Sequence, residues 1–241
     1  MAVAFATAAV ATNFDSTIEY CRPYLTQKDA DFSITVTREN MDFEQADSIR
    51  EALEEGIRPR RYTAPYLERA AIRRQFADYL YGQDTLLFHG STVAVDGTAY
   101  LFTAPCGTGK STHTRLWCQV FGQRAVMVND DKPFLRLEGD RILACGSPWS
   151  GKHGLDSNVQ LPLGGICLLE RGLENVIRPL SPAEAMPWLR KQAYCPDRPE
   201  AKARFDGLVQ QLAENVPLWT MACNKDPEAA LVAHAAMAAK Y

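Results

Sequence analysis

Residues 104–112 combine glycines, a lysine and hydroxyl side chains at the spacing of a phosphate-binding loop. Gly107 and Gly109 can adopt positive φ, so that successive backbone N–H groups converge on phosphate oxygens. Lys110 would reach the β- and γ-phosphates, and Ser111 would bind Mg²⁺ at the start of the following helix, where the helix dipole favours anions. The residues expected to hold a nucleotide are Ala104, Pro105, Cys106, Gly107, Thr108, Gly109, Lys110, Ser111 and Thr112.

This loop departs from the usual pattern at its first position, where Ala104 stands in place of a glycine. Pro105 stiffens the entry to the loop, and Cys106 lies inside it. A glycine-rich turn that binds nothing is the alternative, so the flanking segments must decide between the two interpretations.

The flanking segments favour the phosphate loop. Residues 91–95 and 98–103 are rich in strand-forming types and are joined by Asp96 and Gly97, a strong signal for a two-residue hairpin. Residues 111–121 carry apolar side chains at helical spacing, so the order is strand, loop, helix. Because the hairpin makes the loop-bearing strand antiparallel to its predecessor, the sequence predicts a mixed sheet.

A pair of aspartates follows the next apolar run, residues 125–128. Beside a phosphate loop, one carboxylate can hold Mg²⁺ while the other accepts a proton from an attacking hydroxyl. Adjacent aspartates at a strand end can also simply form a turn. We expect Asp130 and Asp131 to divide the roles of metal ligand and general base, with Ser111 as a further metal ligand, and the sequence does not assign which aspartate does which.

Four segments of the chain together resemble the HPr kinase/phosphorylase and phosphoenolpyruvate carboxykinase group of P-loop proteins. They are residues 88–91, 104–112, 129–131 and 146–152. The resemblance extends from residue 88 to residue 172 and implies an α/β fold, α+β-like in its mixed sheet, with a P-loop core and flanking helices. In that family the histidine at the position of His89 faces the phosphates or the metal. The resemblance therefore makes His89, Lys110, Asp130 and Asp131 the expected catalytic residues.

The length of the chain separates the two branches of this group. Phosphoenolpyruvate carboxykinases carry an additional lobe, for which 241 residues leave little room. HPr kinases join a separate N-terminal domain to a compact kinase domain, and the N-terminus here does not match that domain. The chain is most similar to small HPr-kinase-like proteins, some of which act on free serine or on ribosomal peptides. Since their acceptors vary, the resemblance does not identify the acceptor.

Three further basic residues could contact a phosphate or substrate. Lys152 lies in the donor-rich segment 146–152, Arg171 follows the apolar run 165–169, and Arg115 lies just inside the helix after the loop. Each could neutralise charge on a transferred phosphoryl group. Each could equally be a solvated surface side chain or a member of an edge ion pair.

Composition limits the classes of partner. A formal net charge of −3 offers no general attraction for nucleic acid or an anionic membrane, and no apolar stretch reaches transmembrane length. No basic residue precedes the alanine-rich start, so a signal peptide is not expected. The seven cysteines show neither metal-site spacing nor a disulfide framework, which indicates reduced thiols and a cytoplasmic location.

The sequence divides into N-terminal strands and helices, residues 1–82, packed on a kinase-like core, residues 83–241. Other elements are expected at residues 1–12 (a strand or frayed helix), 32–37 (strand), 64–81 (helix), 181–192 (capped helix), 201–214 (helix), 216–223 (strand) and from 227 (helix).

Taken together, these patterns predict a Mg²⁺-dependent phosphotransferase that uses ATP, with GTP left open, and acts on a hydroxyl of a protein, peptide or small molecule. A serine is the favoured acceptor, and homo-oligomers and a reverse phosphorolysis reaction are left open. The alternatives are a non-catalytic nucleotide-binding sensor or interaction module and, less favoured, a phosphoenolpyruvate carboxykinase.

Overall fold

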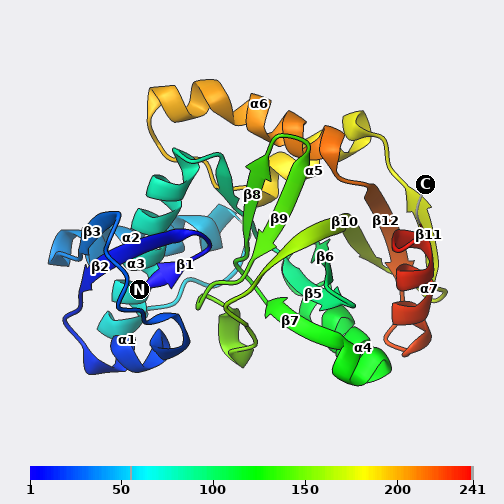
Figure 1. The fold of residues 1–241 in the computed structure, drawn as a ribbon, viewed down its shortest axis with the longest axis horizontal. Coiled ribbons are helices and arrows are strands. Elements are labelled where there is room, and N and C mark those ends of the chain that lie inside the picture. Colours follow the sequence, from blue (N-terminus) through cyan, green and yellow to red (C-terminus); the bar gives the residue numbers. More distant parts are fainter. Residues whose placement is uncertain (55, 240–241) are drawn as a thin grey trace. The chain divides into compact units, whose positions relative to one another are not determined.

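The computed structural model describes residues 1–54 and 56–239. The chain forms two compact units, residues 1–79 and 80–241 (Figure 1). Within the described residues, no helix has both the length and the apolar character needed to cross a bilayer.

Among its described residues, the first unit contains a small three-stranded sheet, three α-helices and one 3₁₀ helix. In the sheet, β2 pairs antiparallel with β1 and parallel with β3. The elements are β1 (Ala2–Val3), β2 (Ala6–Ala11), α1 (Asp15–Tyr20), η1 (Arg22–Tyr24), β3 (Phe32–Thr35), α2 (Arg38–Glu54) and α3 (Ala64–Tyr81). The chain therefore begins with strands and not with a helix. The predicted helix over residues 64–81 is confirmed, whereas α1 and α2 were not predicted.

The second unit is built on a nine-stranded mixed sheet. Its main order is β4-β8-β9-β10-β6-β5-β7, with β12 also paired to β10 and β11 paired to β12. The strands are β4 (Thr85–Leu87), β5 (Ser91–Val95), β6 (Thr98–Thr103), β7 (Ala125–Asn129), β8 (Phe134–Glu138), β9 (Arg141–Cys145), β10 (Gln160–Arg171), β11 (Val176–Pro179) and β12 (Leu218–Cys223). The helices are α4 (Lys110–Phe121), η2 (Gly122–Arg124), η3 (Gly151–His153), α5 (Pro182–Gln192), α6 (Pro199–Asn215) and α7 (Glu228–Met237).

The predicted hairpin joins β5 to β6. The two strands pair antiparallel up to Val95 and Thr98, and the two residues between them, Asp96 and Gly97, have φ of 50° and 81°. Positive φ at both central positions is the geometry that matches the twist of a two-residue hairpin. On its other side β6 pairs parallel with β10, so the predicted mixed sheet is confirmed.

Strand β10 changes partners along its length. Its first residues pair antiparallel with β9, and its later residues pair parallel with both β6 and β12. The change occurs between Pro162 and Leu163, and the new pairing with β6 is irregular at Gly164, where an added Cβ would come within 2.6 Å of the Thr98 Cγ2 atom. Only glycine permits this close approach of neighbouring strands. The apolar run at residues 165–169 predicted only the parallel half of the strand.

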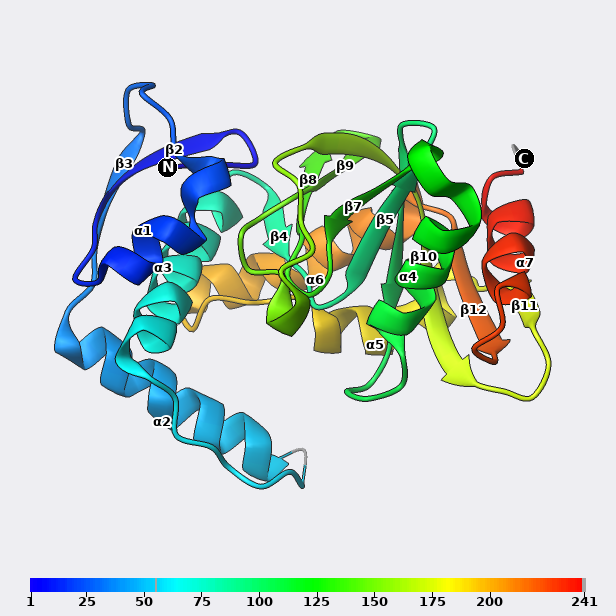
Figure 2. The ribbon, with the colours of Figure 1, turned by 90° about the horizontal axis from the view of Figure 1, so that it is seen from below.

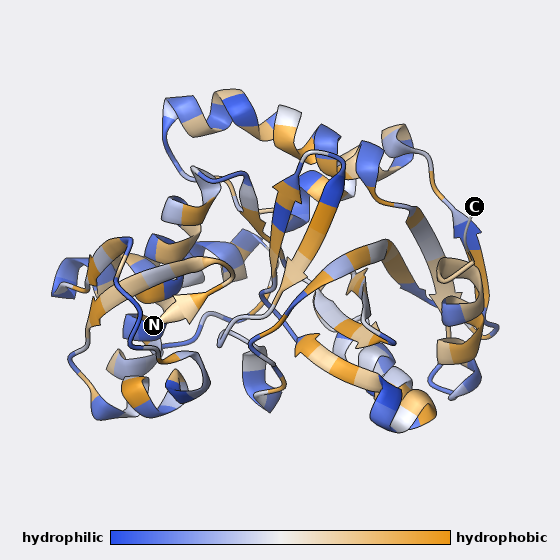
Figure 3. Ribbon diagram, in the orientation of Figure 1, coloured by the Kyte–Doolittle hydropathy of each residue, from blue (hydrophilic) through white to orange (hydrophobic). Residues whose placement is uncertain are grey.

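Apolar clusters lie on both faces of this sheet. Leu101 and Ile166 point toward the cluster that includes residues of α5 and α6, and the adjacent Phe102 and Cys167 point toward the cluster that includes residues of α4 and α7. Side chains of successive strand residues alternate between faces, so each strand serves both clusters. Apolar residues run along β9 and β10, while α6 alternates between hydrophilic and hydrophobic residues (Figure 3). Helix α4 packs against β5 and β7 and runs beside β5 in Figure 2. Its N-terminus lies near the end of β6, because only six residues separate the two elements.

Candidate functional site

A six-residue loop connects β6 to α4, as the order strand, loop, helix predicts. Gly107 and Gly109 have φ of 75° and 126°, and nothing lies within 4 Å of an added Cβ at either position. Glycine is therefore required by the backbone conformation and not by lack of space. The first N–H groups of α4 have no partners within the helix, because such partners would have to lie before its first turn. Phosphate binding by this loop stays a prediction.

Lys110 folds back over the loop that precedes it. Its Nζ donates a hydrogen bond to the backbone oxygen of Ala104 at 3.0 Å. Ala104 is fully buried, so the start of the loop is fixed to the core while the ammonium group spans from α4 back to that start. The Lys110 ammonium group therefore lies against the loop at which the sequence predicts phosphate binding.

Arg171 also contacts the loop. Its Nη2 donates to the backbone oxygen of Gly107 at 2.6 Å, from the last residue of β10. The parallel pairing of β6 with β10 explains the contact, because strands that run the same way end at the same edge. Arg115 is placed differently, since its Nε donates to the oxygen of Ser111 at 3.1 Å in its own helix. Of the two arginines, only Arg171 hydrogen-bonds to the connection between β6 and α4, residues 104–109.

The two neighbouring aspartates have different surroundings. Asp130 is 5% exposed, and its Oδ1 accepts a hydrogen bond of 2.7 Å from the Ser91 hydroxyl. The Asp131 side chain is 33% exposed, and its Oδ1 lies 3.4 Å from the Nε2 of His89, which is 31% exposed. The structure thus brings His89 to Asp131 and leaves Asp130 enclosed.

The backbone of His89 is anchored at the point where the loop begins. Its N–H donates to the oxygen of Gln192 at 2.8 Å, and its oxygen accepts from the Thr103 hydroxyl at 3.0 Å. Thr103 is the last residue of β6, so the same strand end positions both His89 and the loop. The N–H of Gly90 donates to the oxygen of Asp131 at 3.0 Å, which ties the two predicted catalytic segments together.

Asn129 fixes the turn that carries the two aspartates, residues 129–132, which we call the acidic turn. Its Oδ1 accepts from the N–H groups of Asp131 at 2.8 Å and Lys132 at 2.6 Å, and its Nδ2 donates to the oxygen of Ser147 at 2.8 Å. An asparagine side chain that bonds the backbone two residues on is a common turn former, and that chemistry was the available signal in the sequence. Sequence reasoning included Asn129 in a motif but gave it no role. Its amide fixes the direction of Asp131 and holds the 146–150 segment beside it.

The segment at residues 146–154 lies against Asp131. An added Cβ at Gly151 would lie 3.2 Å from the Cβ of Asp131. Lys152 follows it in the exposed turn η3. Trp149 is buried and meets Phe134 edge to face, with ring centroids 6.3 Å apart. The structure therefore supports a packing role for Trp149.

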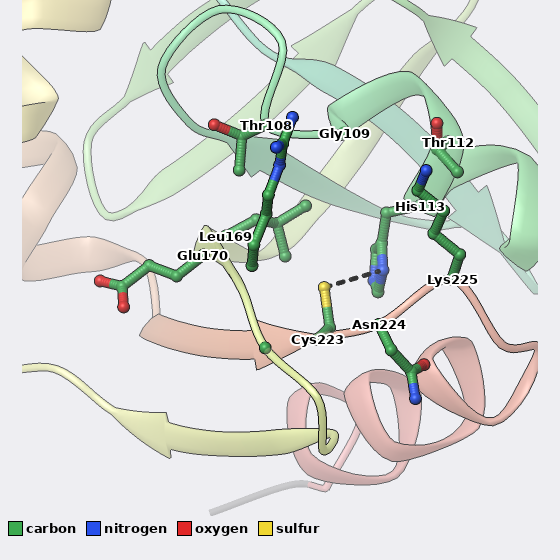
Figure 4. Close-up of a pocket in the computed structure, with 11 residues that line it drawn as sticks. Thr108, Gly109, Thr112, His113, Leu169, Glu170, Cys223, Asn224 and Lys225 are labelled. Atoms are coloured by element: carbon green, nitrogen blue, oxygen red, sulfur yellow. Dashed lines mark hydrogen bonds between the residues drawn. The ribbon is translucent and has the colours of Figure 1, made fainter.

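A cavity of about 350 Å³ adjoins the loop (Figure 4). It lies between Thr108 and Gly109 on one side and the ends of β10 and β12 on the other. Its remaining lining comprises Thr112, His113, Leu169, Glu170, Arg171, Gly172, Cys223, Asn224 and Lys225. Its place at the carboxyl ends of parallel strands is where ligands commonly bind in α/β proteins.

His113 forms part of the cavity wall in neutral form. Its Nε2 accepts a hydrogen bond of 3.1 Å from the Trp117 indole, and its Nδ1 lies 3.9 Å from the Sγ of Cys223. Burial lowers the pKa of His113 from 6.5 to about 4, because the apolar surroundings disfavour the charged ring. Sequence reasoning gave neither His113 nor Cys223 a role in this site, since neither lies in a motif.

The predicted magnesium ligands supply oxygen atoms only. Ser111, Asp130 and Asp131 offer one hydroxyl and two carboxylates, which are hard donors of the kind Mg²⁺ takes together with water and nucleotide phosphates. Thr114, in the helix that begins with Lys110 and Ser111, connects to Asp130 through Ser91, because its hydroxyl lies 2.7 Å from the Ser91 hydroxyl, which donates to Asp130. Among the described residues, no group of three or more histidine, cysteine, aspartate or glutamate side chains is arranged to hold a metal.

Comparison with known proteins leaves the family open. No protein-family model matches the chain, and no curated protein matches it. One solved structure that matches is the Hpr(Ser) kinase/phosphatase from Coxiella burnetii, with a TM-score of 0.35 and 11% identity over 61% of this chain and 90% of that chain. This similarity is too distant to carry an argument about activity. The sequence resemblance to HPr kinases stays a prediction. The functional proposal therefore rests on the residues of the site.

Proposed function

We propose that the protein is a Mg²⁺-dependent phosphotransferase that moves the γ-phosphoryl group of ATP to a hydroxyl. One observation supports this most strongly: Lys110 and Arg171, from different elements, both contact the backbone of the loop between β6 and α4. A turn that only connects two elements has no need of two cations. A loop that receives a triphosphate needs both positive charge and free N–H groups.

The cavity beside the loop gives the rest of the nucleotide a place. Its volume of about 350 Å³ lies within the range of small-molecule sites, roughly 300–1,000 Å³. Thr108 and Gly109 belong both to the loop and to the cavity wall. A nucleotide with its phosphates on the loop could therefore extend its ribose and base into this cavity.

Differences in exposure support the proposal of separate tasks for the two aspartates. Asp131 is partly exposed and near His89, so it is the proposed general base, with His89 as the group that orients it. Asp130 is enclosed and hydrogen-bonded to Ser91, so it is the proposed metal ligand together with Ser111. When bound there, Mg²⁺ would neutralise charge on the phosphate oxygens.

The proposed transfer is a direct displacement at phosphorus. As the acceptor oxygen forms its bond to the γ-phosphorus, the bond from that phosphorus to the bridging oxygen breaks and ADP leaves. Asp131 takes the proton from the acceptor hydroxyl, while Lys110 and Arg171 stabilise the negative charge on the oxygens. The proposed acceptor is a serine hydroxyl of a protein, a peptide or a small molecule.

Calorimetric titration with ATP and with GTP, each with and without Mg²⁺, tests the donor site. Lys110→Ala should weaken binding about a hundredfold or more, whereas Lys191→Ala on the exposed face of α5 is the matched control and should bind normally. ADP release in the presence of serine and serine-containing peptides then tests transfer. Binding without transfer to any acceptor would favour a nucleotide sensor, and turnover that depends on oxaloacetate would favour a carboxykinase.

A further inference from the structure

A buried chain of hydrogen bonds joins α4 to the acidic turn. The hydroxyls of Ser91 and Thr114 lie 2.7 Å apart, and Ser91 Oγ lies 2.7 Å from Asp130 Oδ1. Ser91 and Thr114 are fully buried, and Asp130 is 5% exposed. The three residues come from β5, from α4 and from the turn after β7, so the chain connects three separate segments.

The direction of the protons in this chain follows from donor counting. The Ser91 hydroxyl has a single proton, and it donates that proton to Asp130, because an ionised carboxylate can only accept. The hydrogen bond between Thr114 and Ser91 therefore has Thr114 as donor. The competing acceptors for Thr114, the oxygens of Lys110 and Ser111, are each 3.4 Å away, where a hydroxyl hydrogen bond is weak. Both protons thus point toward the carboxylate.

Apolar packing would serve a purely structural role at least as well. Burying a carboxylate and two hydroxyls is unfavourable unless each group is hydrogen-bonded, and apolar residues of similar volume are often equally stable in such places. The arrangement does offer geometric control. Thr114 lies one helical turn after Lys110 and Ser111, so its hydroxyl fixes Asp130 relative to the first turn of α4.

We infer that Thr114 and Ser91 are positioning residues that hold Asp130 in place to share a magnesium ion with Ser111. This inference rests on the proposed function. It has a specific consequence: without the two hydroxyls, the part of nucleotide affinity that depends on Mg²⁺ weakens. The part that the loop and Lys110 supply without metal stays unchanged.

The test is calorimetric titration of ATP into wild type, Ser91→Ala, Thr114→Val and Thr114→Ser, each in excess Mg²⁺ and in EDTA. Thr114→Val removes the hydroxyl at nearly constant volume, and Thr114→Ser keeps it, so the two form a matched pair. Loss of one hydrogen bond of the chain, either Ser91 to Asp130 or Thr114 to Ser91, should weaken binding in Mg²⁺ about tenfold for Ser91→Ala and Thr114→Val. Binding in EDTA should change less than about twofold, and Thr114→Ser should behave as wild type in both conditions.

The double variant Ser91→Ala/Thr114→Val adds a second measurement. If the hydroxyls act as one chain, the double variant should be about as weak as Ser91→Ala alone, because residues within one network are not additive. Thermal unfolding of each variant shows whether it is folded, and Ser91→Ala carries the test if Thr114→Val does not fold.

The inference and the proposed function fail in different ways. Equal weakening in Mg²⁺ and in EDTA, or no weakening in either, would overturn the positioning role while leaving the nucleotide site intact. A wild-type protein that binds ATP equally with and without Mg²⁺ would contradict the proposed metal. A wild-type protein that binds no nucleotide would overturn the proposed function and the inference together.

Discussion

The site has a loop side, residues 104–112 with Arg171, and an acidic side, Asp130 and Asp131 with His89 and Ser91. On the loop side, two cations hydrogen-bond to backbone oxygens, which a phosphate could replace as partners. On the acidic side, a fixed network surrounds one carboxylate and leaves its neighbour partly exposed. On the loop side, Lys110 and Arg171 can therefore exchange their backbone partners for phosphate when a nucleotide binds. On the acidic side, the geometry of the carboxylates is set before binding.

Removing the charge of the exposed carboxylate should have the largest effect. Asp131→Asn keeps the size of the side chain, but its amide cannot take the proton from the substrate hydroxyl. Turnover should therefore fall roughly 10²- to 10⁴-fold. ATP affinity should change little, because the loop side is untouched. Steady-state rates and calorimetry measure the two quantities, with Asp140→Asn in the exposed turn between β8 and β9 as the control. Full turnover in Asp131→Asn would contradict the proposed role of Asp131 as the general base.

On the loop side, Lys110→Ala should weaken ATP binding by about a hundredfold or more, as expected for loss of a charge-assisted contact to phosphate. The fold should persist, because the side chain is bonded to a loop oxygen and not packed in the core. Calorimetry gives the affinity, and circular dichroism gives the fold. Wild-type affinity in this variant would show that the loop does not hold the phosphates.

The buried imidazole of His113, in the wall of the cavity beside the loop, makes the stability of the protein depend on pH. The folded protein holds His113 neutral with a pKa of about 4, whereas the unfolded ring has its ordinary value of 6.5. Below pH 6.5 His113 is therefore protonated in the unfolded chain but not in the folded chain. The free energy of unfolding falls as the pH drops toward 4. The full loss is about 3 kcal/mol.

Urea unfolding at several pH values between 7 and 4 measures this dependence. His113→Gln should show a shallower decline over the same range than wild type, even if it is less stable at pH 7. Parallel curves for the two proteins would mean that His113 is not the group responsible.

Arg171 provides the smallest effect and the sharpest contrast. Arg171→Ala should weaken ATP binding about tenfold, since it removes one exposed contact at the edge of the loop. Arg115→Ala removes a guanidinium bonded to its own helix and should change affinity less than about twofold. Equal effects of the two substitutions would mean that proximity to the loop, and not the contact to Gly107, determines the contribution.

Local chemistry made much of the second unit predictable. The hairpin at Asp96 and Gly97 and the capping box of Ser181 and Glu184 are determined by neighbouring residues, and both are present in the structure. Strands β8 and β9 were not predicted, although their residues are largely buried. Helix α2 was also missed, because it buries Glu44 and Asp47 against Arg74 in place of an apolar stripe.

The same distinction applies to the site. The loop is contiguous, so residue types and spacing sufficed to single it out. The network around Asp130 draws on Ser91 and Thr114, which are 23 residues apart in the sequence. Ser91 lies in the segment 88–91 that carries the resemblance, but no local pattern marks Thr114 or predicts the contact between the two hydroxyls. The sequence offered Arg115 and Arg171 on similar terms, and only the pairing of β6 with β10 distinguishes them.

The change of partners along β10 has a consequence for how this unit folds. Its parallel half needs β6, which precedes it by many residues, and β12, which follows it by many residues. Such long-range pairings require large loops to close, and the entropy of loop closure is lost before the stabilising contacts form. Folding of this unit should therefore be slow. During synthesis the edge of β10 that pairs with β12 stays open until residue 223 has left the ribosome, and the nascent protein is exposed to aggregation at that edge until then.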